Sequence, residues 1–370
     1  MTNAEKTLGM DVLGTGAPVR RAATGGPDRP LSISRIPGID GLRALAILIV
    51  MVSHAGLGRY VPGGFGVTIF FFLSGYLITT LLRVEYSRSG RINLPAFYMR
   101  RVLRILPPLY LTMTLVVVLA LTAVIDTRVT PLNLITDALF LTNYAGLLGL
   151  PSTTPIPLWS LDVEEHFYML FPACFAALAM WRGSRIARTL GAICLLTLLI
   201  RIATFAAIGE GEIYYWSHTR IDSIIFGAVL AVWQNPMLDE DAWRPRPWHV
   251  ALALLVIALT LALRAPAFRE TLRYTLQGGA LFVLFSAAIQ ARGPVARLLA
   301  QRWLRVVALF SYTLYLVHMP MLEAMRPLGL WSVPVAYVLA FAWAAGMYAC
   351  VERPLARRRQ RSLRKVVQGA

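Results

Sequence analysis

The sequence predicts an all-α, polytopic integral membrane protein with about ten transmembrane helices and both termini in the cytoplasm. Three observations predict it. Of the 370 residues, 57% are hydrophobic, more than a soluble domain of this length buries in one core. Windows of about 20 largely uncharged residues, the length of a helix that crosses a bilayer, recur along the chain. Lys and Arg gather in alternate loops between these windows.

The ten apolar windows lie at residues 43–58, 64–82, 105–125, 161–181, 189–208, 219–234, 248–263, 274–291, 306–325 and 331–351. A weaker apolar stretch, 132–150, contains Asn133, Asp137 and Asn143. Because polar groups are costly within hydrocarbon, we expect a re-entrant or interfacial segment there. An eleventh span is the alternative. The stretch belongs to a long loop, 126–160, which we expect on the outer side.

Charge placement supports an even number of spans. With the N-terminus inside, 27 Lys and Arg residues fall on the cytoplasmic side and 7 on the other. An eleventh span would invert every loop after residue 150 and remove this asymmetry. The net charge of +17 therefore reflects topology. The basic residues are dispersed over short loops, without a recognisable binding module, so no nucleic-acid partner is predicted.

The two ends of the chain differ from its membrane part. Residues 1–35 are polar and lack the apolar core of a signal peptide, which predicts a disordered cytoplasmic leader. A membrane domain should extend over 36–352. Residues 353–370 form a basic segment that we expect to lie in the cytoplasm on anionic headgroups.

Familiar soluble catalytic signatures are missing. There is no P-loop, dinucleotide glycine fingerprint, HExxH or GxSxG motif. Cys174, Cys194 and Cys350 each lie in an apolar window without metal-ligand spacing, so neither a disulfide framework nor a metal site is predicted. Chemistry should therefore reside in charged residues of the membrane helices or at their ends.

The first window contains Arg43 and His54. The ten residues between them cover about 15 Å, roughly half the hydrocarbon thickness. Their separation corresponds to three helical turns plus about 20°, which places both side chains on one face, so one cavity could contain both. Alternatively, Arg43 snorkels or pairs with Asp40, and His54 ends the span at the outer interface.

Arg100, Arg101 and Arg104 gather at the cytoplasmic start of the third window. Arg101 and Arg104 are three residues apart on one helix face, so their guanidinium groups can grip one polyanion. The alternative is that positive-inside bias alone explains the cluster.

The fourth window opens with several ionisable residues, which predict a polar cavity wall; simple complementation of the helix dipole is the alternative. These residues are Asp162, Glu164, Glu165 and His166.

Five further residues stand out, four in later windows and one in the second. Arg220 and Asp222 occupy the start of one span and are expected to line the substrate cavity. Arg201 should face the bundle interior, because a buried arginine needs a partner. His318 is expected to be a structural, hydrogen-bonded histidine. Gly75 should permit close helix approach.

Seven blocks, taken in order from about residue 36 to 357, resemble the membrane acyltransferase family often called acyltransferase 3. They are GIDGLRALAILIVMVSHAG, GGFGVTIFFFLSGYLI, RRVLRILP, WSLDVEEHFYMLFP, RIDSIIFGAVLA, SYTLYLVHMPM and VERP. The resemblance implies transfer of an acyl group, commonly acetyl from cytoplasmic acetyl-CoA. The implied acceptors are sugar hydroxyls of surface polysaccharides, lipid-linked glycans or glycosylated natural products, at a bacterial cytoplasmic (inner) membrane.

The resemblance also implies roles by position. His54 matches the essential histidine with Arg43 as its partner, and Arg101 and Arg104 match an arginine pair that holds the donor. Glu164 matches the acid of a block shaped by Trp159 and Ser160, and Glu352 with Arg353 matches the last short motif. This chain has His166 where many relatives have Gln. It shows no C-terminal hydrolase-like domain, which predicts a stand-alone transferase core.

Acyl transfer needs a base, stabilisation of the thioester oxyanion and a grip on the donor. His54 could take the acceptor proton or be acylated itself, and Glu164 could orient its imidazole. Arg43 could lie near the pyrophosphate or thioester of CoA. The competing class is a transporter or flippase using the same intramembrane charges, which inverted repeats and broken helices would favour; neither is evident.

Overall fold

The computed structural model describes residues 37–150 and 155–357, and helices without any strand make up the secondary structure of these ranges. This confirms the all-α class. The expected leader, 1–35, and most of the expected tail lie outside the described residues.

Each of the ten predicted windows contains a helix. These helices are α1 (Pro37–Val52), α2 (Gly63–Ser89), α3 (Leu94–Leu121), α5 (Leu158–Leu178), α6 (Gly183–Ile208), α7 (Ser217–Trp233), α8 (Pro247–Ala262), α10 (Leu272–Ile289), α12 (Arg302–Ala324) and α13 (Ser332–Met347). Shorter elements connect them: α4 (Pro131–Ala138), α9 (Pro266–Glu270), α11 (Gly293–Leu299), 3₁₀ turns at Thr142–Tyr144, Glu212–Tyr214 and Arg326–Trp331, and π-helical turns at Ser53–Leu57 and Tyr348–Glu352.

Seven helical stretches of the described chain are long and apolar enough to cross a membrane, which makes this a multi-pass membrane protein. They contain α1, α2, α3, α6, α10, α12 and α13. Of the other three, α7 and α8 are short, with 17 and 16 residues, and α5 carries acids in its first turns. The count of ten and the cytoplasmic termini remain predictions.

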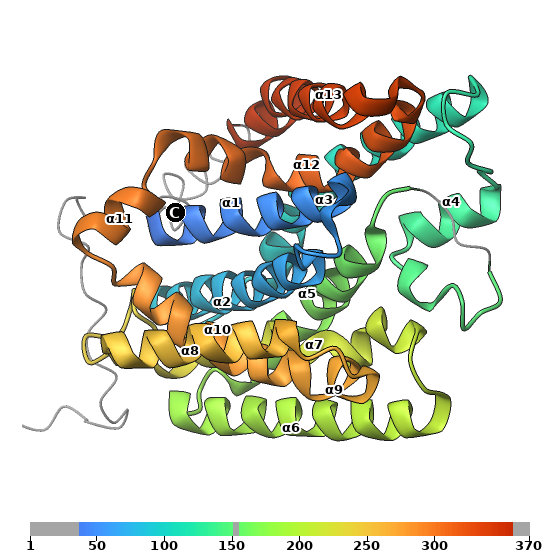
Figure 1. Cartoon of the computed structure of the whole chain (residues 1–370). Coiled ribbons are helices and arrows are strands. Elements are labelled where there is room, and N and C mark those ends of the chain that lie inside the picture. The colour runs from blue at the N-terminus through green and yellow to red at the C-terminus, as the bar shows by residue number, and fades with distance from the viewer. Residues whose placement is uncertain (1–36, 151–154, 358–370) are drawn as a thin grey trace, which may run out of the picture.

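The helices form a bundle with α2 at its centre. In the most apolar window of α2, 72% of the residues are buried, against 17% in α6 and in the stretch containing α13. Figure 1 shows α13 at the top and α6 at the bottom, with α1 and α2 between them. Helix α2 packs on both α1 and α7, and α12 packs on α1 and α13. The peripheral helices therefore present apolar side chains outward.

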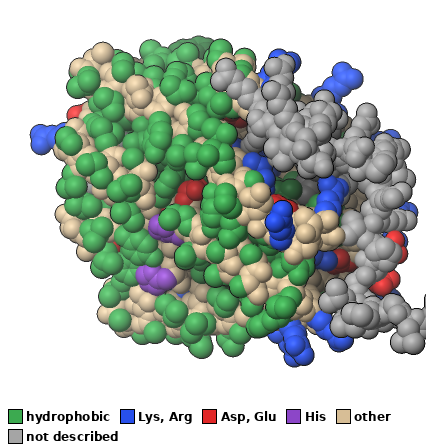
Figure 2. Space-filling view, turned by 180° about the vertical axis from the view of Figure 1, so that it is seen from behind, with side chains coloured by type: hydrophobic (Ala, Val, Ile, Leu, Met, Phe, Trp, Pro, Cys, Tyr) green, Lys and Arg blue, Asp and Glu red, His purple; other side chains and the backbone are tan. Residues whose placement is uncertain are grey.

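We call the end at which α1 and α12 begin the inner end, and the opposite end the outer end. In Figure 1, α11 lies at the inner end on the left and α4 at the outer end on the right. Figure 2, seen from behind, shows most Lys and Arg side chains toward the inner end, while hydrophobic side chains cover the rest of this face. The inner end is the one predicted to be cytoplasmic.

Two glycines allow α2 and α7 to touch. A Cβ atom on Gly75 would lie 1.9 Å from the carbonyl oxygen of Ile224, and one on Gly227 would lie 1.9 Å from that of Phe72. Both distances are far below a van der Waals contact, so the two backbones meet only because neither residue has a side chain. The close approach expected at Gly75 is confirmed.

The stretch 132–150 does not form an eleventh span. Helix α4 has eight residues, about 12 Å in length, and is followed by the 3₁₀ turn at Thr142–Tyr144. Thr130 accepts a hydrogen bond from the Asn133 amide and so caps the start of α4. The segment then packs against α5 through Asn143, whose backbone N–H donates to Asp162 at 2.9 Å.

Candidate active site

A cavity of about 710 Å³ extends from the inner end of the bundle past its middle, between α1, α2, α3, α5 and α12. Leu73, Leu77 and Ile105 form part of an apolar wall. The charged lining residues are five arginines and three carboxylates: Arg43, Arg88, Arg100, Arg101 and Arg104, with Asp40, Glu85 and Glu164. The cavity therefore combines a positive lining with an apolar interior.

The predicted arginine cluster lies in this cavity. Arg101 stacks over the ring of Tyr168, with its guanidinium carbon 4.6 Å from the ring centre, and it also lies over Phe97. Arg100 forms an ion pair of 3.2 Å with Glu85. Arg104 is exposed, one helical turn beyond Arg101 on the same face. Their arrangement leaves cationic groups available to a polyanion at the cavity opening.

Glu164 lies in the cavity wall and is held in place by two hydroxyl groups. Ser74 of α2 donates to its Oε2 at 2.9 Å, and Tyr168, one turn later on α5, donates to the same atom at 2.8 Å. Oε1 accepts no hydrogen bond from the described residues. The carboxylate is thus fixed through one oxygen, with the other available to a ligand.

A hydrogen bond joins α5 and α12 in the outer part of the cavity lining. The hydroxyls of Ser160 and Tyr315 lie 2.5 Å apart, and both residues line the cavity. Phe70 packs edge-on against the Tyr315 ring, with centroids 6.2 Å apart. These three side chains form a polar and aromatic part of the cavity wall.

His54 does not line the cavity and pairs with His318. The Nδ1 atom of His54 is 2.8 Å from Nε2 of His318, and the rings are stacked within 12° of parallel. His318 is fully buried, whereas His54 is exposed in the π-helical turn that ends α1. Widened turns of this kind occur frequently at functional sites. The Tyr315 ring centroid is 5.9 Å from that of His318.

The structure corrects two expectations about His54. The cavity contains Arg43 but not His54, because eleven residues of helix separate them by roughly 16 Å. Glu164 hydrogen-bonds Ser74 and Tyr168, and the hydrogen-bond partner of the His54 imidazole is His318.

The acids of α5 do not form one wall. Successive residues of a helix are rotated by about 100°, so the acids point in different directions. Only Glu164 lines the cavity among Asp162, Glu164 and Glu165. Asp162 is buried and binds the Asn143 amide, and His166 Nδ1 lies 2.6 Å from the Ser217 hydroxyl on α7. This corrects the expectation that these residues form one cavity wall.

The remaining predicted residues have structural partners in the outer half. The fully buried Arg220 lies over the Tyr274 ring at 3.8 Å and the Tyr214 ring at 5.0 Å. Trp159 packs on Tyr214 with centroids 4.8 Å apart. Burial raises the pKa of Tyr214, in a loop between spans, to about 12, so its phenol stays neutral. Arg220 and Trp159 therefore belong to an aromatic cluster outside the cavity.

Asp222 pairs with Arg201 in the bundle interior. Both side chains are fully buried, and the Thr275 hydroxyl donates to the same Asp222 oxygen at 3.0 Å. This confirms that Arg201 faces inward, but it moves Asp222 from the predicted substrate cavity to an ion pair joining α6 and α7.

Sequence reasoning missed Ser74, Tyr168, Tyr315 and the pairing of His318. Tyr168 had a signal, since it follows Glu164 by one helical turn. Tyr315 and His318, three residues apart on α12, likewise share a face. Nothing local indicated which other helix that face would meet.

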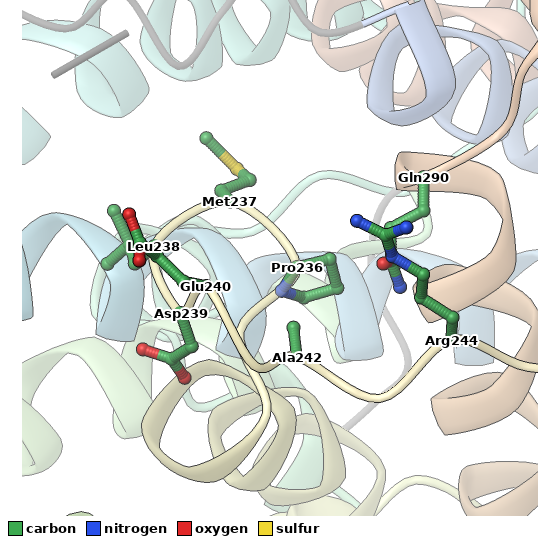
Figure 3. Close-up of a pocket in the computed structure, with 8 residues that line it drawn as sticks. All are labelled: Pro236, Met237, Leu238, Asp239, Glu240, Ala242, Arg244 and Gln290. Carbon is green, nitrogen blue, oxygen red and sulfur yellow. The ribbon is translucent and has the colours of Figure 1, made fainter. Parts of the chain in front are cut away.

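A second cavity, of about 230 Å³, lies at the inner end between the loop after α7 and the end of α10. Figure 3 shows Arg244 and Gln290 next to each other at one side, across from Leu238 and Glu240. Asp239 of the same loop forms an ion pair with Arg83 of α2 at 2.8 Å. The loop is therefore anchored to α2, and this cavity is separate from the larger one.

The chain is similar to several known proteins. YrhL of Bacillus subtilis is 30% identical over 350 residues, 86% of this chain and 55% of its own length. Peptidoglycan O-acetyltransferase OatA of Listeria monocytogenes is 28% identical over 351 residues, which are 86% of this chain and 56% of its own length. O-acetyltransferase OatA of Staphylococcus aureus is 28% identical over 307 residues, which are 78% of this chain and 50% of its own length.

The chain spans about half the length of these curated relatives. No solved structure matches it. A family model described as an acyltransferase domain matches residues 36–350, which covers most of the chain and nearly all of the helical bundle. The chain therefore belongs to the acyltransferase 3 family.

Proposed function

We propose that this protein is a bacterial inner-membrane O-acyltransferase. It moves an acyl group, with acetyl as the first candidate, from cytoplasmic acyl-CoA to a hydroxyl of a sugar-containing acceptor. The observation that carries the proposal is the cavity itself. It has an arginine-lined opening at the inner end, and it reaches Ser160 and Tyr315, one helical turn before His318 and its partner His54.

The donor fits the cavity by charge and size. The phosphates of CoA need cationic partners, and arginine guanidinium groups bind phosphate oxygens bidentately. A volume of about 710 Å³ is within the range of small-molecule sites, and the apolar wall suits a pantetheine arm. In this arrangement Arg101 and Arg104 hold phosphates, and Arg43 lies deeper, nearer to the thioester.

His54 is the proposed catalytic residue. In the direct route, its imidazole takes the proton of the acceptor hydroxyl while the oxygen attacks the thioester carbonyl. The C–S bond breaks, and the CoA thiolate leaves and takes up a proton. In the covalent route, an imidazole nitrogen attacks first and carries the acyl group to the hydroxyl. Both routes require the acyl group to reach His54 from the cavity.

The acceptor is proposed to be a glycan at the outer end. All three relatives carry the names of O-acetyltransferases, and the names of the Bacillus and Listeria proteins specify peptidoglycan. Aromatic rings gather at this end of the bundle, among them Trp159, Tyr214 and Tyr215. Peptidoglycan fragments are therefore the first acceptor to test.

The test measures release of free CoA thiol by purified protein in lipid nanodiscs, with acetyl-CoA and soluble peptidoglycan fragments. We expect His54→Ala to reduce thiol release and acetylation of the fragments to background while the protein stays inserted. His249→Gln, a histidine at the inner end and remote from the cavity, is the matched control and should retain activity. Full activity of inserted His54→Ala would refute the assignment.

The same assay separates the alternatives. A transporter or flippase would release no thiol with any acceptor. Without acceptor, the covalent route should release about one thiol per protein in a rapid first phase, whereas the direct route should release none.

A further inference from the structure

We propose that His318 is a positioning residue that holds His54 in the tautomer with its proton on Nδ1, and so keeps Nε2 of His54 unprotonated for the reaction. This inference rests on the proposed function, because it assigns His318 a role in the chemistry of His54. It replaces the purely structural role that the sequence suggested for His318.

The first step concerns the tautomer of His318. Its Nδ1 lies 2.9 Å from the carbonyl oxygen of Leu314, one turn earlier on α12. A carbonyl oxygen only accepts hydrogen bonds, so Nδ1 of His318 must carry the proton. A neutral imidazole has one N–H group, which leaves Nε2 of His318 as an acceptor.

A charged His318 is disfavoured by its surroundings. The side chain is fully buried, and it forms no ion pair with a carboxylate of the described residues. Val317, Met321 and Leu314 belong to the apolar cluster around it. Burying an unpaired charge in such a place costs far more than keeping the ring neutral.

The second step concerns His54. Its Nδ1 is 2.8 Å from the acceptor nitrogen of His318, so this Nδ1 must be the donor. Neutral His54 then has no proton on Nε2, and that atom makes no hydrogen bond to a described residue. Because His54 is exposed at the outer end, its lone pair is accessible to an acceptor hydroxyl or an acyl carbonyl.

The pair also helps after proton transfer. When Nε2 of His54 takes a proton, the ring becomes an imidazolium, and its Nδ1–H bond to His318 becomes charge-assisted and stronger. His318 thereby performs what the aspartate of a Ser-His-Asp triad does, fixing tautomer and orientation, but without a net charge. A neutral partner suits this position, where a buried carboxylate would itself need compensation.

The experiment compares His318→Leu with His318→Gln in the full chain. Leucine removes the acceptor but fits the apolar surroundings, whereas the side-chain oxygen of glutamine can still accept from Nδ1–H of His54. Nitrogen NMR of protein labelled in its histidines reports the tautomer of His54, and the signal is assigned by its loss in His54→Ala. Thermal unfolding confirms that both variants are folded.

We expect wild-type His54 to carry its proton on Nδ1 and His318→Leu to lose this preference. The kcat should fall by about 10-fold to 100-fold in His318→Leu, part of what general-base catalysis supplies, with the KM for acetyl-CoA little changed. His318→Gln should recover both the tautomer and most of kcat.

Two results would overturn the inference. One is an unchanged His54 tautomer in folded His318→Leu; the other is equal loss of kcat in both variants with no change of tautomer, which would indicate a packing role. If instead the wild-type protein transfers no acyl group but shows the expected tautomer, the proposed function fails while the geometry of the pair stands.

Discussion

Arg101 and Arg104 lie one turn apart on α3 but in different surroundings. Arg101 is partly buried over the Tyr168 ring, which holds the guanidinium in one orientation, whereas Arg104 is exposed. Both line the cavity at its inner end, so the same two charges that satisfy the positive-inside bias are placed to bind a ligand. At this scale, position within the cavity distinguishes a binding arginine from one that only sets topology.

We expect Arg101→Gln and Arg104→Gln each to raise the KM for acetyl-CoA by roughly 10-fold to 100-fold, because a hydrogen bond to a charged group contributes about 1.5–3 kcal/mol. The kcat should change much less. The measurement is steady-state thiol release at several acetyl-CoA concentrations.

Arg185→Gln supplies the matched control, since Arg185 is an exposed arginine at the inner end of α6 and does not line the cavity. A KM in the two test variants equal to that of Arg185→Gln would remove the cavity arginines from donor binding.

At the scale of elements, the contact of α2 with α7 supports the cavity. Helix α2 supplies Ser74, which holds Glu164, and its next residue, Gly75, meets the backbone of α7. The position of one cavity wall therefore depends on two helices touching without side chains between them. Without a strong hydrophobic driving force between helices in lipid, such close packing is a principal source of association.

Gly75→Ala should lower stability by about 1–3 kcal/mol, since its Cβ would lie 1.9 Å from the Ile224 carbonyl oxygen and the helices would have to separate. Unfolding of the purified protein in detergent, followed by loss of helical signal, measures the change. Activity should fall with it, because Ser74 moves.

The control is Gly191→Ala on α6, where an added Cβ meets nothing within 4 Å. It should be neutral or slightly stabilising, since alanine favours a helix. Equal stability of the Gly75→Ala protein and wild type would show that the two helices are not in backbone contact.

At the scale of the whole molecule, charge and cavity share one axis. Most Lys and Arg side chains gather toward the inner end, where the large cavity has its arginine lining, and His54 lies outside the cavity, toward the other end. A donor from the cytoplasm and an acceptor from outside would therefore approach the two sides of Tyr315. The proposed direction of transfer depends on the predicted orientation in the membrane.

Single cysteines test that orientation. In a chain whose three native cysteines are replaced, we place one at Arg91, Arg128 or Glu240, which are all exposed. In intact cells a membrane-impermeant maleimide should label Arg128→Cys alone, and the other two only after permeabilisation.

Three predicted spans, α5, α6 and α7, lie between residues 128 and 240, so these two residues should be on opposite sides of the membrane. Labelling of both Arg128→Cys and Glu240→Cys from outside would mean an additional crossing or a missing one in that interval. Labelling of Arg91→Cys and Glu240→Cys without labelling of Arg128→Cys would mean that the whole topology is inverted.

The sequence by itself determined the helices and the inner-end charges. Apolar windows marked where helices form, because the length needed to cross a bilayer is set by its thickness. Spacing along one helix placed Arg101 and Arg104 on one face, and the structure puts both in one cavity. The ordered motifs identified the family, which the family model confirms over residues 36–350.

The tertiary structure decided which helix faces meet. Hydropathy does not set the rotation of a membrane helix about its axis, because lipid and the protein interior are both apolar. The bond from His54 to His318 joins positions 264 apart, and that from Ser74 to Glu164 joins positions 90 apart. No periodicity within one helix contains these pairings, so the partner of His54 and the separation of Arg43 from it emerged only from the packed bundle.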